Sequence, residues 1–281
     1  IPLRLVGSEM CIRDSPSGVP VFVQLLGSDP TLMAANAARA ATLGAPGIDL
    51  NFGCPAKTVN RSQGGAALLR TPLLIRSICQ AVRERVPKTV PVTAKIRLGY
   101  DTEDQFEEIL DALAQVELSE LTIHARTRRQ GYRPPAHWHQ LSKATQKMPY
   151  PVIANGELWS PSDVTRCAAI SGCDTFMLAR GALCRPDLAA AIQGHHRGLE
   201  PPAFAWQQTQ ELLIQFLERN QQSYDDRYAV NPVKQWLMYL RIYYPQAGAL
   251  FNEVKRINDP TQMAQALSLI HISEPTRRRG I

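Results

Sequence analysis

Six short apolar runs alternate with helix-like stretches along the middle of the chain, and this alternation limits the possible folds more than any other feature. The runs begin at Val21, Gly47, Val90, Glu120, Pro151 and Asp174. Helix-like stretches lie between them at 30–43, 71–86, 103–116 and 161–170, several opened by Asp, Thr or Ser and some by Pro. Strands that alternate with helices form right-handed βαβ units, so the pattern predicts a parallel sheet.

Polar residues cluster at the C-terminal end of each run, which favours a TIM (β/α)₈ barrel over a doubly wound sheet. Six runs are two short of a full barrel, and we attribute the missing first two strands to a chain that begins after them. After Arg185 only helical periodicity remains. We therefore expect an α/β fold with a partial TIM-barrel domain over 16–193, a linker over 194–202 and a small all-α domain of three or four helices over 203–266.

The two ends of the chain have the character of non-native peptides. Residues 6–14 (VGSEMCIRD) and 267–277 (LSLIHISEPTR) can be back-translated to one DNA segment read on opposite strands. That segment resembles a transposase adapter used in sequencing libraries, so we expect 1–15 and 267–281 to be adapter-derived and the natural protein to be truncated at both ends. The ends account for +2 of the formal net charge of +6, and the remaining +4 modestly favours an acidic partner such as nucleic acid.

Composition excludes several classes of protein. Hydrophobic residues make up 44% and charged residues 20%, which is typical of globular proteins, and no apolar run approaches the roughly 18 residues that span a bilayer. The six cysteines show neither a CxxC pair nor the dense spacing of a secreted disulfide scaffold. We expect a cytoplasmic monomer that uses no metal and no membrane.

One cysteine lies where a barrel carries its chemistry. Cys54 follows the second run in the segment Asn51–Pro55, and a basic, glycine-rich turn comes next. Composition alone favours an inert buried cysteine, but a Gly/Pro-bounded loop at the catalytic face favours a functional thiol. A thiol with a pKa near ~8.5 is mostly protonated at neutral pH, so it can act as a proton donor or as a nucleophile.

Polar side chains also end the later runs. Lys95 and Arg97 share one parity on the third run, and His124 and Arg126 repeat this spacing on the fourth, although a lone His is more often a core residue. Asn155–Glu157 and Ala179–Gly181 end the last two runs. The loops after strands seven and eight of many barrels bind a phosphate, so these two segments indicate a phosphate-bearing cofactor.

These motifs resemble those of the tRNA-dihydrouridine synthases. The resemblance rests on LNFGCPAKTVNRSQGGAALL, on Gln24 in VQLLG, and on the KIRLG, HART, ANGE and ARG runs, and it covers about residues 16–260. The segments AKTVN, ISGCD and KQWLMYLR look most like the bacterial subfamily that modifies uridine 16.

The resemblance implies an FMN-dependent enzyme that uses NADPH and acts on tRNA. A hydride would pass from flavin N5 to C6 of uracil while Cys54 protonates C5, and Asn51, Arg97, Arg126 and Tyr132 would lie near the target base or the RNA. The implied FMN-binding residues are Gln24, Lys95, His124, Asn155, Gly156, Glu157, Ala179 and Arg180. Ala179 departs from the family, whose members often have Gly there. The family's N-terminal APM segment, which covers one face of the flavin, is not in this sequence, so we expect weak FMN retention.

The helical tail supplies candidates for holding the body of the tRNA. We expect Arg227, Lys234 and Arg241 to contact phosphates, which positions RNA without reading its sequence. They are interleaved with aromatic residues, most of which we expect in the core: Tyr224, Tyr228, Trp236, Tyr239, Tyr243 and Tyr244.

Two other functions stay open at this point. The same FMN barrel could reduce or oxidise a free pyrimidine, as enzymes of the dihydroorotate-dehydrogenase type do, although the aromatic and basic tail argues against it. The chain could also be a non-catalytic tRNA-binding protein that keeps the fold.

Overall fold

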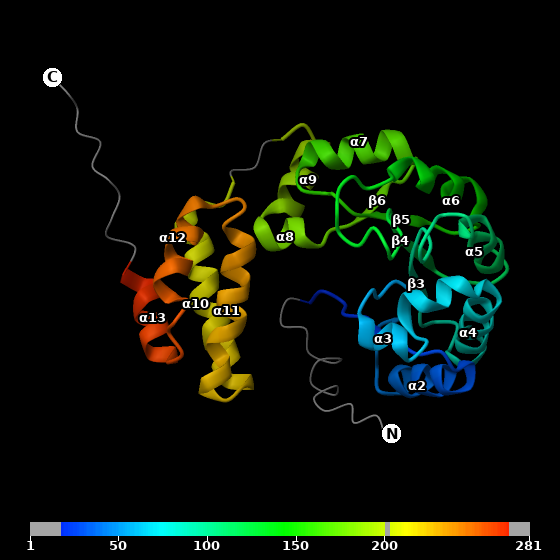
Figure 1. Cartoon of the computed structure of the whole chain (residues 1–281), viewed down its shortest axis with the longest axis horizontal. Coiled ribbons are helices and arrows are strands. Elements are labelled where there is room, and N and C mark those ends of the chain that lie inside the picture. The colour runs from blue at the N-terminus through cyan, green and yellow to red at the C-terminus, as the bar shows by residue number, and fades with distance from the viewer. Residues whose placement is uncertain (1–17, 200–202, 270–281) are drawn as a thin grey trace. The chain divides into compact units, whose positions relative to one another are not determined.

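The chain forms two compact units. The computed structural model describes residues 18–199 and 203–269 (Figure 1). Contacts between Cα atoms divide them into two units, with the main division after Met177. The first, which we call the sheet unit, comprises the described residues up to Glu157 together with Ser162–Met177. The second, the helical unit, contains Leu158–Pro161 and the chain from Leu178 onward.

Six parallel strands build the sheet unit, and they pair in chain order from first to last. They are β1 (Val23–Leu25), β2 (Ile48–Asn51), β3 (Val92–Arg97), β4 (Glu120–His124), β5 (Val152–Asn155) and β6 (Thr175–Met177). A doubly wound sheet reverses its order at a switch point, whereas a barrel adds each strand beside the previous one. The observed order confirms the predicted barrel-type α/β fold, here with six strands in the described residues.

Helices follow the strands as the sequence predicts. The four expected helices are α2 (Pro30–Thr42), α4 (Pro72–Arg85), α5 (Phe106–Leu113) and α7 (Pro161–Ser171). Asp29 caps α2, because its carboxylate accepts a hydrogen bond from Leu32 N at 2.9 Å and Pro30 takes the first turn. Four shorter segments complete this part of the chain: α3 (Lys57–Arg61), η1 (Gly65–Arg70), η2 (Trp138–Gln140) and α6 (Leu141–Lys147).

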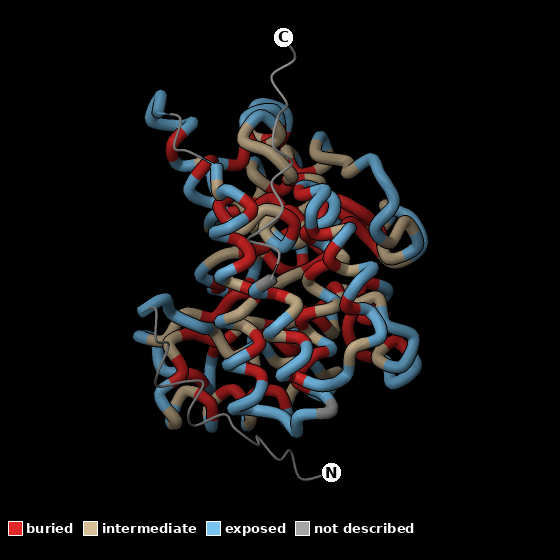
Figure 2. The backbone as a smooth tube through the Cα atoms, turned by 90° about the vertical axis from the view of Figure 1, so that its left-hand side faces the viewer, coloured by how far each residue is buried: buried red, intermediate tan, exposed pale blue. Residues whose placement is uncertain are grey.

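The two faces of the sheet differ in polarity. On β3, Val92, Ala94 and Ile96 are fully buried on the side that the helices cover. The alternate residues Thr93, Lys95 and Arg97 point to the other face because side chains alternate along a strand. In Figure 2 buried and exposed segments alternate along the helices, as expected where each helix buries one face. The polar inner face of the sheet is therefore where chemistry can occur.

The helical unit consists of six helices in the described residues. These are α8 (Arg180–Cys184), α9 (Leu188–His196), α10 (Trp206–Ser223), α11 (Asp226–Leu240), α12 (Pro245–Val254) and α13 (Pro260–Leu269). The last four pack around one apolar core that includes Leu213, Val233, Leu237 and Leu250. This agrees with the three or four helices predicted for the tail.

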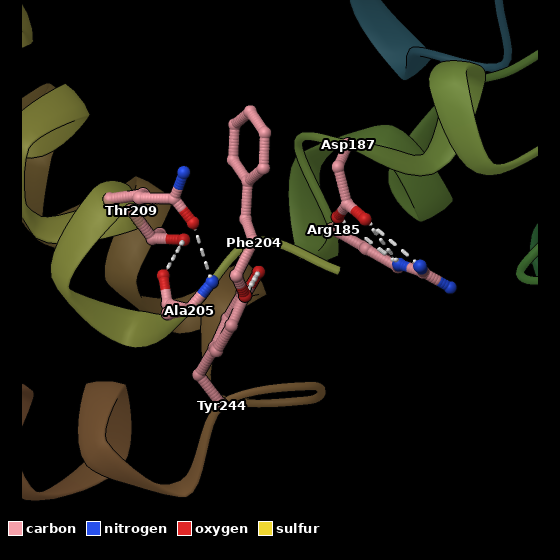
Figure 3. A network of polar contacts seen from close by, with 7 residues as sticks. Arg185, Asp187, Phe204, Ala205, Thr209 and Tyr244 are labelled. Atoms are coloured by element: carbon pink, nitrogen blue, oxygen red, sulfur yellow. Dashed lines mark hydrogen bonds and ion pairs between the residues drawn. The ribbon is translucent and has the colours of Figure 1, made fainter. Parts of the chain in front are cut away.

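The predicted boundary between the domains needs correction. Residues 194–196, expected in a linker, are the last turn of α9. Contacts also place α8 and α9 with the helical unit, because Trp236 Nε1 donates a hydrogen bond to Leu183 O at 2.9 Å and the Arg185 guanidinium lies 5.1 Å from the Tyr243 ring centroid. Figure 3 shows Arg185 paired with Asp187, and the Tyr244 hydroxyl bonded to Phe204 O at 3.2 Å. The sequence pattern does not show such contacts. It therefore predicted that the barrel domain ends one helix after the last strand-like run.

The predicted adapter peptides lie almost entirely outside the described residues, which exclude 1–17, 200–202 and 270–281. Residues 267–269 complete α13, and Leu267 is buried in the helical core. In the part of the chain that is described, no helix combines the length and the apolar character needed to cross a membrane.

Candidate active site

The carboxyl ends of the strands bring most of the predicted residues together. In the strand register Asn51 lies opposite Lys95, Arg97 opposite His124, and His124 opposite Asn155. Lys95 Nζ donates a hydrogen bond to Asn155 Oδ1 at 3.0 Å, which crosses from β3 to β5. The inner face therefore presents one continuous polar surface at this edge of the sheet.

The loop that carries Cys54 is fixed by hydrogen bonds to its backbone. Asn51 Oδ1 accepts from the N–H groups of Gly53 and Cys54, both at 3.0 Å. The Cys54 carbonyl accepts from Asn60 Nδ2 at 2.9 Å and from Ala66 N at 3.0 Å. Because both its N–H and its carbonyl are held, the backbone that carries the Cys54 thiol has a defined position where β2 ends.

Cys54 is also the least buried of the described cysteines. Cys79, Cys167, Cys173 and Cys184 are buried, and burial raises the pKa of each of these thiols, whereas Cys54 is partly accessible. A partly accessible thiol can meet a substrate and a buried one cannot. Of the described cysteines, Cys54 is thus the one that a substrate could reach, and its catalytic role stays a prediction.

A glycine gives this cysteine the room it needs. Gly65 has a φ of 60°, and a Cβ added there would lie 2.9 Å from both Cys54 Cβ and Cys54 O. Any larger residue would be strained and would also push against the cysteine.

Lys95 carries a charge that has no carboxylate partner in the described residues. Burial and, to a smaller extent, repulsion by Arg97 lower the pKa of Lys95 from 10.5 to about 8, and Asp49 opposes this shift by favouring the charged form. An ammonium group has three donors, and the bond to Asn155 uses one of them. An anionic or electron-rich ligand on the inner face would fit the remaining donors.

Sequence reasoning missed Asp49. Gln24 Nε2 donates to Asp49 Oδ2 at 2.6 Å, Thr93 Oγ1 donates to Asp49 Oδ1 at 2.7 Å, and Asn51 Nδ2 donates to Gln24 Oε1 at 2.8 Å. The carboxylate thus fixes which end of the Gln24 amide faces Asn51. Asp49 precedes Asn51 by two residues, the same spacing that singled out Lys95 and Arg97, so the signal was present in the sequence.

Arg97 holds two loops together instead of being open to solvent. Its side chain is 3% exposed, and Nε donates to Gly53 O at 2.8 Å while Nη1 donates to Gly131 O at 3.0 Å and Thr127 O at 3.3 Å. Tyr132, in contrast, is 54% exposed, and its ring centroid lies 6.0 Å from that of His124. Of these two predicted RNA neighbours, Tyr132 is the accessible one.

The predicted RNA contact of Arg126 is not supported, since its side chain is fully buried at 0% exposure. Arg126 pairs with Glu157 at 2.7 Å and donates to Arg133 O at 2.7 Å, and its Nη1 lies 3.2 Å from His124 Nε2. Spacing along the strand correctly predicted that it faces inward with His124. It could not predict that a carboxylate on the next strand end would pair with it.

The segment after β5 turns sharply at Gly156 and Glu157. Both have positive φ values, 118° and 58°, and a Cβ at Gly156 would lie 2.9 Å from His124 Cδ2. Trp138 Nε1 donates to Gly156 O at 2.8 Å. Only glycine fits beside His124, which explains the small residue in this predicted cofactor segment.

The remaining predicted residues belong to the helical unit. Ala179 and Arg180 follow β6 in the chain, and the Arg180 guanidinium lies 5.2 Å from the Trp159 ring centroid. Lys234 donates to Asn258 Oδ1 at 3.1 Å, and Arg241 is exposed just after α11. Arg227 lies in α11, but its side chain is outside what the structure describes. Roles for these residues in phosphate and tRNA binding stay predictions.

The prediction that most tail aromatics lie in the core is wrong. Tyr244 is buried and Trp236 is partly buried, but the other four are exposed: Tyr224, Tyr228, Tyr239 and Tyr243. On α11 the tyrosines fall on the face away from Val233 and Leu237, so the helix keeps them outside the core.

No cluster of three or more His, Cys, Asp or Glu side chains suited to a metal ion occurs in the described residues.

Comparison with known proteins identifies the family of this chain. A family model described as "Dihydrouridine synthase (Dus)" matches residues 6–275. The chain is 47% identical to a tRNA-dihydrouridine(16) synthase of Aquipseudomonas alcaligenes over 90% of its own length and 80% of that protein. It is 46% identical to enzymes of the same name from Pseudomonas putida, over 90% of this chain and 78% of that one, and from Vibrio cholerae, over 92% and 77%. This chain therefore belongs to the dihydrouridine synthase family of oxidoreductases.

Proposed function

We propose that this chain reduces uridine 16 in the D-loop of tRNA to 5,6-dihydrouridine, with FMN as the bound cofactor and NADPH as the reductant. The observation that carries the proposal is Cys54, an accessible thiol held by its backbone at the edge of a polar barrel face. Relatives 46–47% identical to this chain bear the name tRNA-dihydrouridine(16) synthase, which supports the substrate and the position.

The inner face of the sheet fits a flavin. Lys95 has donors that the described residues leave unused, and burial without an ion pair favours an electron-rich partner. Gln24 and Asn155 would hold the cofactor beside Lys95, and His124 and Gly156 would line the same edge. Glu157 would act through its ion pair with Arg126. Ala179 and Arg180 are proposed to bind the phosphate, on the resemblance alone.

The chemistry divides between the cofactor and the protein. When bound, FMN supplies the hydride that is added at C6 of uracil. Negative charge then develops toward C5 and O4, and the Cys54 thiol delivers a proton to C5 as a general acid. Asn51 and Asn60 hold the cysteine backbone, so only the side-chain rotamer of Cys54 would have to be selected during the reaction.

The target base has to leave the folded tRNA to reach this site. Bases in RNA loops are recognised when they are unstacked and turned out, and this requires contacts that hold the RNA body. Exposed Tyr132 at the strand ends is suited to stack against a base, and Lys234 and Arg241 of the helical unit are suited to phosphates.

A reconstituted assay tests the proposal. The protein, FMN and NADPH are incubated with an unmodified tRNA transcript, and dihydrouridine is located by mass spectrometry of nuclease fragments. We expect one dihydrouridine at position 16 and none in a transcript with cytidine there. Reduction of free uracil or orotate, with no change in tRNA, would establish the free-pyrimidine enzyme instead, and binding of tRNA without any reduction would establish a non-catalytic protein.

A further inference from the structure

Five residues in the sheet unit form a cationic cluster that the mechanism above does not use. We call Arg70, Tyr100, Arg128, Arg129 and Arg133 the arginine platform. Two guanidinium groups lie on the Tyr100 ring, with Cζ of Arg70 at 3.6 Å and Cζ of Arg128 at 5.0 Å from the ring centroid. Cation–π contacts of this kind hold guanidinium groups in place without neutralising them.

The platform keeps an excess of positive charge. Arg70 pairs with Asp101 at 2.9 Å, but no carboxylate of the described residues pairs with Arg128, Arg129 or Arg133. Arg129 and Arg133 are exposed, and Arg133 Nη2 donates to Arg129 O at 3.3 Å, which keeps the two residues together. Like charges gathered without counter-charges repel one another unless an anion joins them. The cluster is therefore suited to an anionic partner.

The platform is connected to the loop of Cys54 through a buried arginine. Arg128 N donates to Gly99 O and Arg129 N donates to Tyr100 O, both at 2.9 Å, so the loops after β3 and β4 form one unit. Arg97 then bonds to Gly131 O at 3.0 Å within that unit and to Gly53 O at 2.8 Å beside Cys54. A ligand on the platform would thus be held at a fixed distance from the thiol.

We propose that the arginine platform binds backbone phosphates of the tRNA beside the nucleotide that enters the active site. The proposal rests on the proposed function, which makes RNA the anion that approaches this edge of the sheet. Guanidinium groups form charge-assisted hydrogen bonds with phosphate oxygens, and their positive charge displaces the counterions of the RNA backbone. The platform would fix the strand flanking the target and leave sequence unread.

The test compares two pairs of exposed arginines. Arg129→Gln with Arg133→Gln removes two charges from the platform. Arg39→Gln with Arg85→Gln is the matched control, because these exposed arginines lie in the last turns of α2 and α4, and helices of a βα unit end at the opposite edge of the sheet. The affinity for a tRNA transcript is measured by fluorescence anisotropy at several salt concentrations.

We expect the platform pair to weaken binding on the order of tenfold and to reduce the slope of log K against log salt by about 2, one for each lost phosphate contact. The control pair should change the slope by less than half of that. A third variant, Arg129→Lys with Arg133→Lys, keeps both charges and should retain the wild-type slope. Equal melting temperatures show that all three variants keep the fold.

Failure of this inference is distinguishable from failure of the proposed function. An unchanged slope in the Gln pair, or equal losses in the platform and control pairs, would overturn the platform even if dihydrouridine still forms. A Lys pair with a slope as low as that of the Gln pair would overturn it too, since charge would then not be the cause. If the Gln pair lowers the salt slope of tRNA binding as expected but the wild-type protein forms no dihydrouridine, the platform stands and the proposed function is contradicted.

Discussion

Replacing Arg97 with Met should destabilise the sheet unit strongly, because one buried side chain holds two loops. The substitution keeps most of the length and apolar volume of the side chain and removes the guanidinium group. Three backbone carbonyls lose their donor: Gly53 O, Thr127 O and Gly131 O. Thr127 and Gly53 are buried, so water does not readily replace the arginine there.

The magnitude follows from these bonds. A buried acceptor left without a donor costs about 1–3 kcal/mol, so the two buried carbonyls, Gly53 O and Thr127 O, together cost roughly 2–6 kcal/mol. Part of this is returned, because burial lowers the pKa of the Arg97 guanidinium, which shows that the folded protein pays to desolvate the charge. We expect a net loss of about 2–4 kcal/mol in the free energy of unfolding.

Urea unfolding followed by circular dichroism measures this loss, with Arg39→Met as the exposed control that should change stability by less than about 0.5 kcal/mol. Hydrogen–deuterium exchange should show faster exchange at residues 53–54 and 127–131 and little change in the strands. A loss below about 1 kcal/mol, or one equal to the control, would refute the idea that Arg97 joins the two loops.

Two further predictions concern residues around the site. Burial places the pKa of Lys95 at about 8, so the ammonium loses its proton above that pH in the folded protein. Burial of the charged form therefore destabilises the folded protein fully below about pH 8, and this loss of stability disappears as the pH rises toward 10.5. FMN affinity, measured by the quenching of flavin fluorescence, should fall up to tenfold per pH unit above about 8, and Lys95→Met should bind FMN weakly at every pH. An FMN affinity of the wild-type protein that stays constant up to about pH 9.5 would contradict this prediction. Gly65→Ala and Gly198→Ala both place alanine at a positive φ, 60° and 68°, but only the former pushes on Cys54. Both should lose about 1 kcal/mol of stability, while dihydrouridine formation should fall at least about tenfold only in Gly65→Ala; equal activities would show that the position of Cys54 is not critical.

The strands and the facing of their side chains could be predicted from the sequence because both depend on local pattern. Alternating runs placed all six strands, and strand parity correctly turned Lys95, His124 and Arg126 to one face. Parity does not show what a side chain meets. Arg126 and Arg97 are buried by partners such as Glu157 and Gly53, which come from other strand ends.

The boundary of the helical unit depends on long-range contacts in the same way. Helix α8 follows directly from β6, so its sequence looks like part of the barrel. Its contact with Trp236, more than fifty residues later, assigns it to the helical unit. The platform was overlooked for a similar reason, since Arg70, Tyr100 and Arg128 are separated in sequence and meet only in the fold.

The central claim is that Cys54 is the acid of a tRNA uridine reductase, and a single-turnover experiment with Cys54→Ala tests it most directly. The variant, with its FMN reduced in advance, is mixed with tRNA, and dihydrouridine is quantified over time by mass spectrometry. Loss of one general acid typically slows a reaction ~10² to 10⁴-fold, so we expect a decrease of that size with unchanged flavin content and tRNA affinity. Dihydrouridine formation at the wild-type rate would show that the proton comes from another group and would contradict the account.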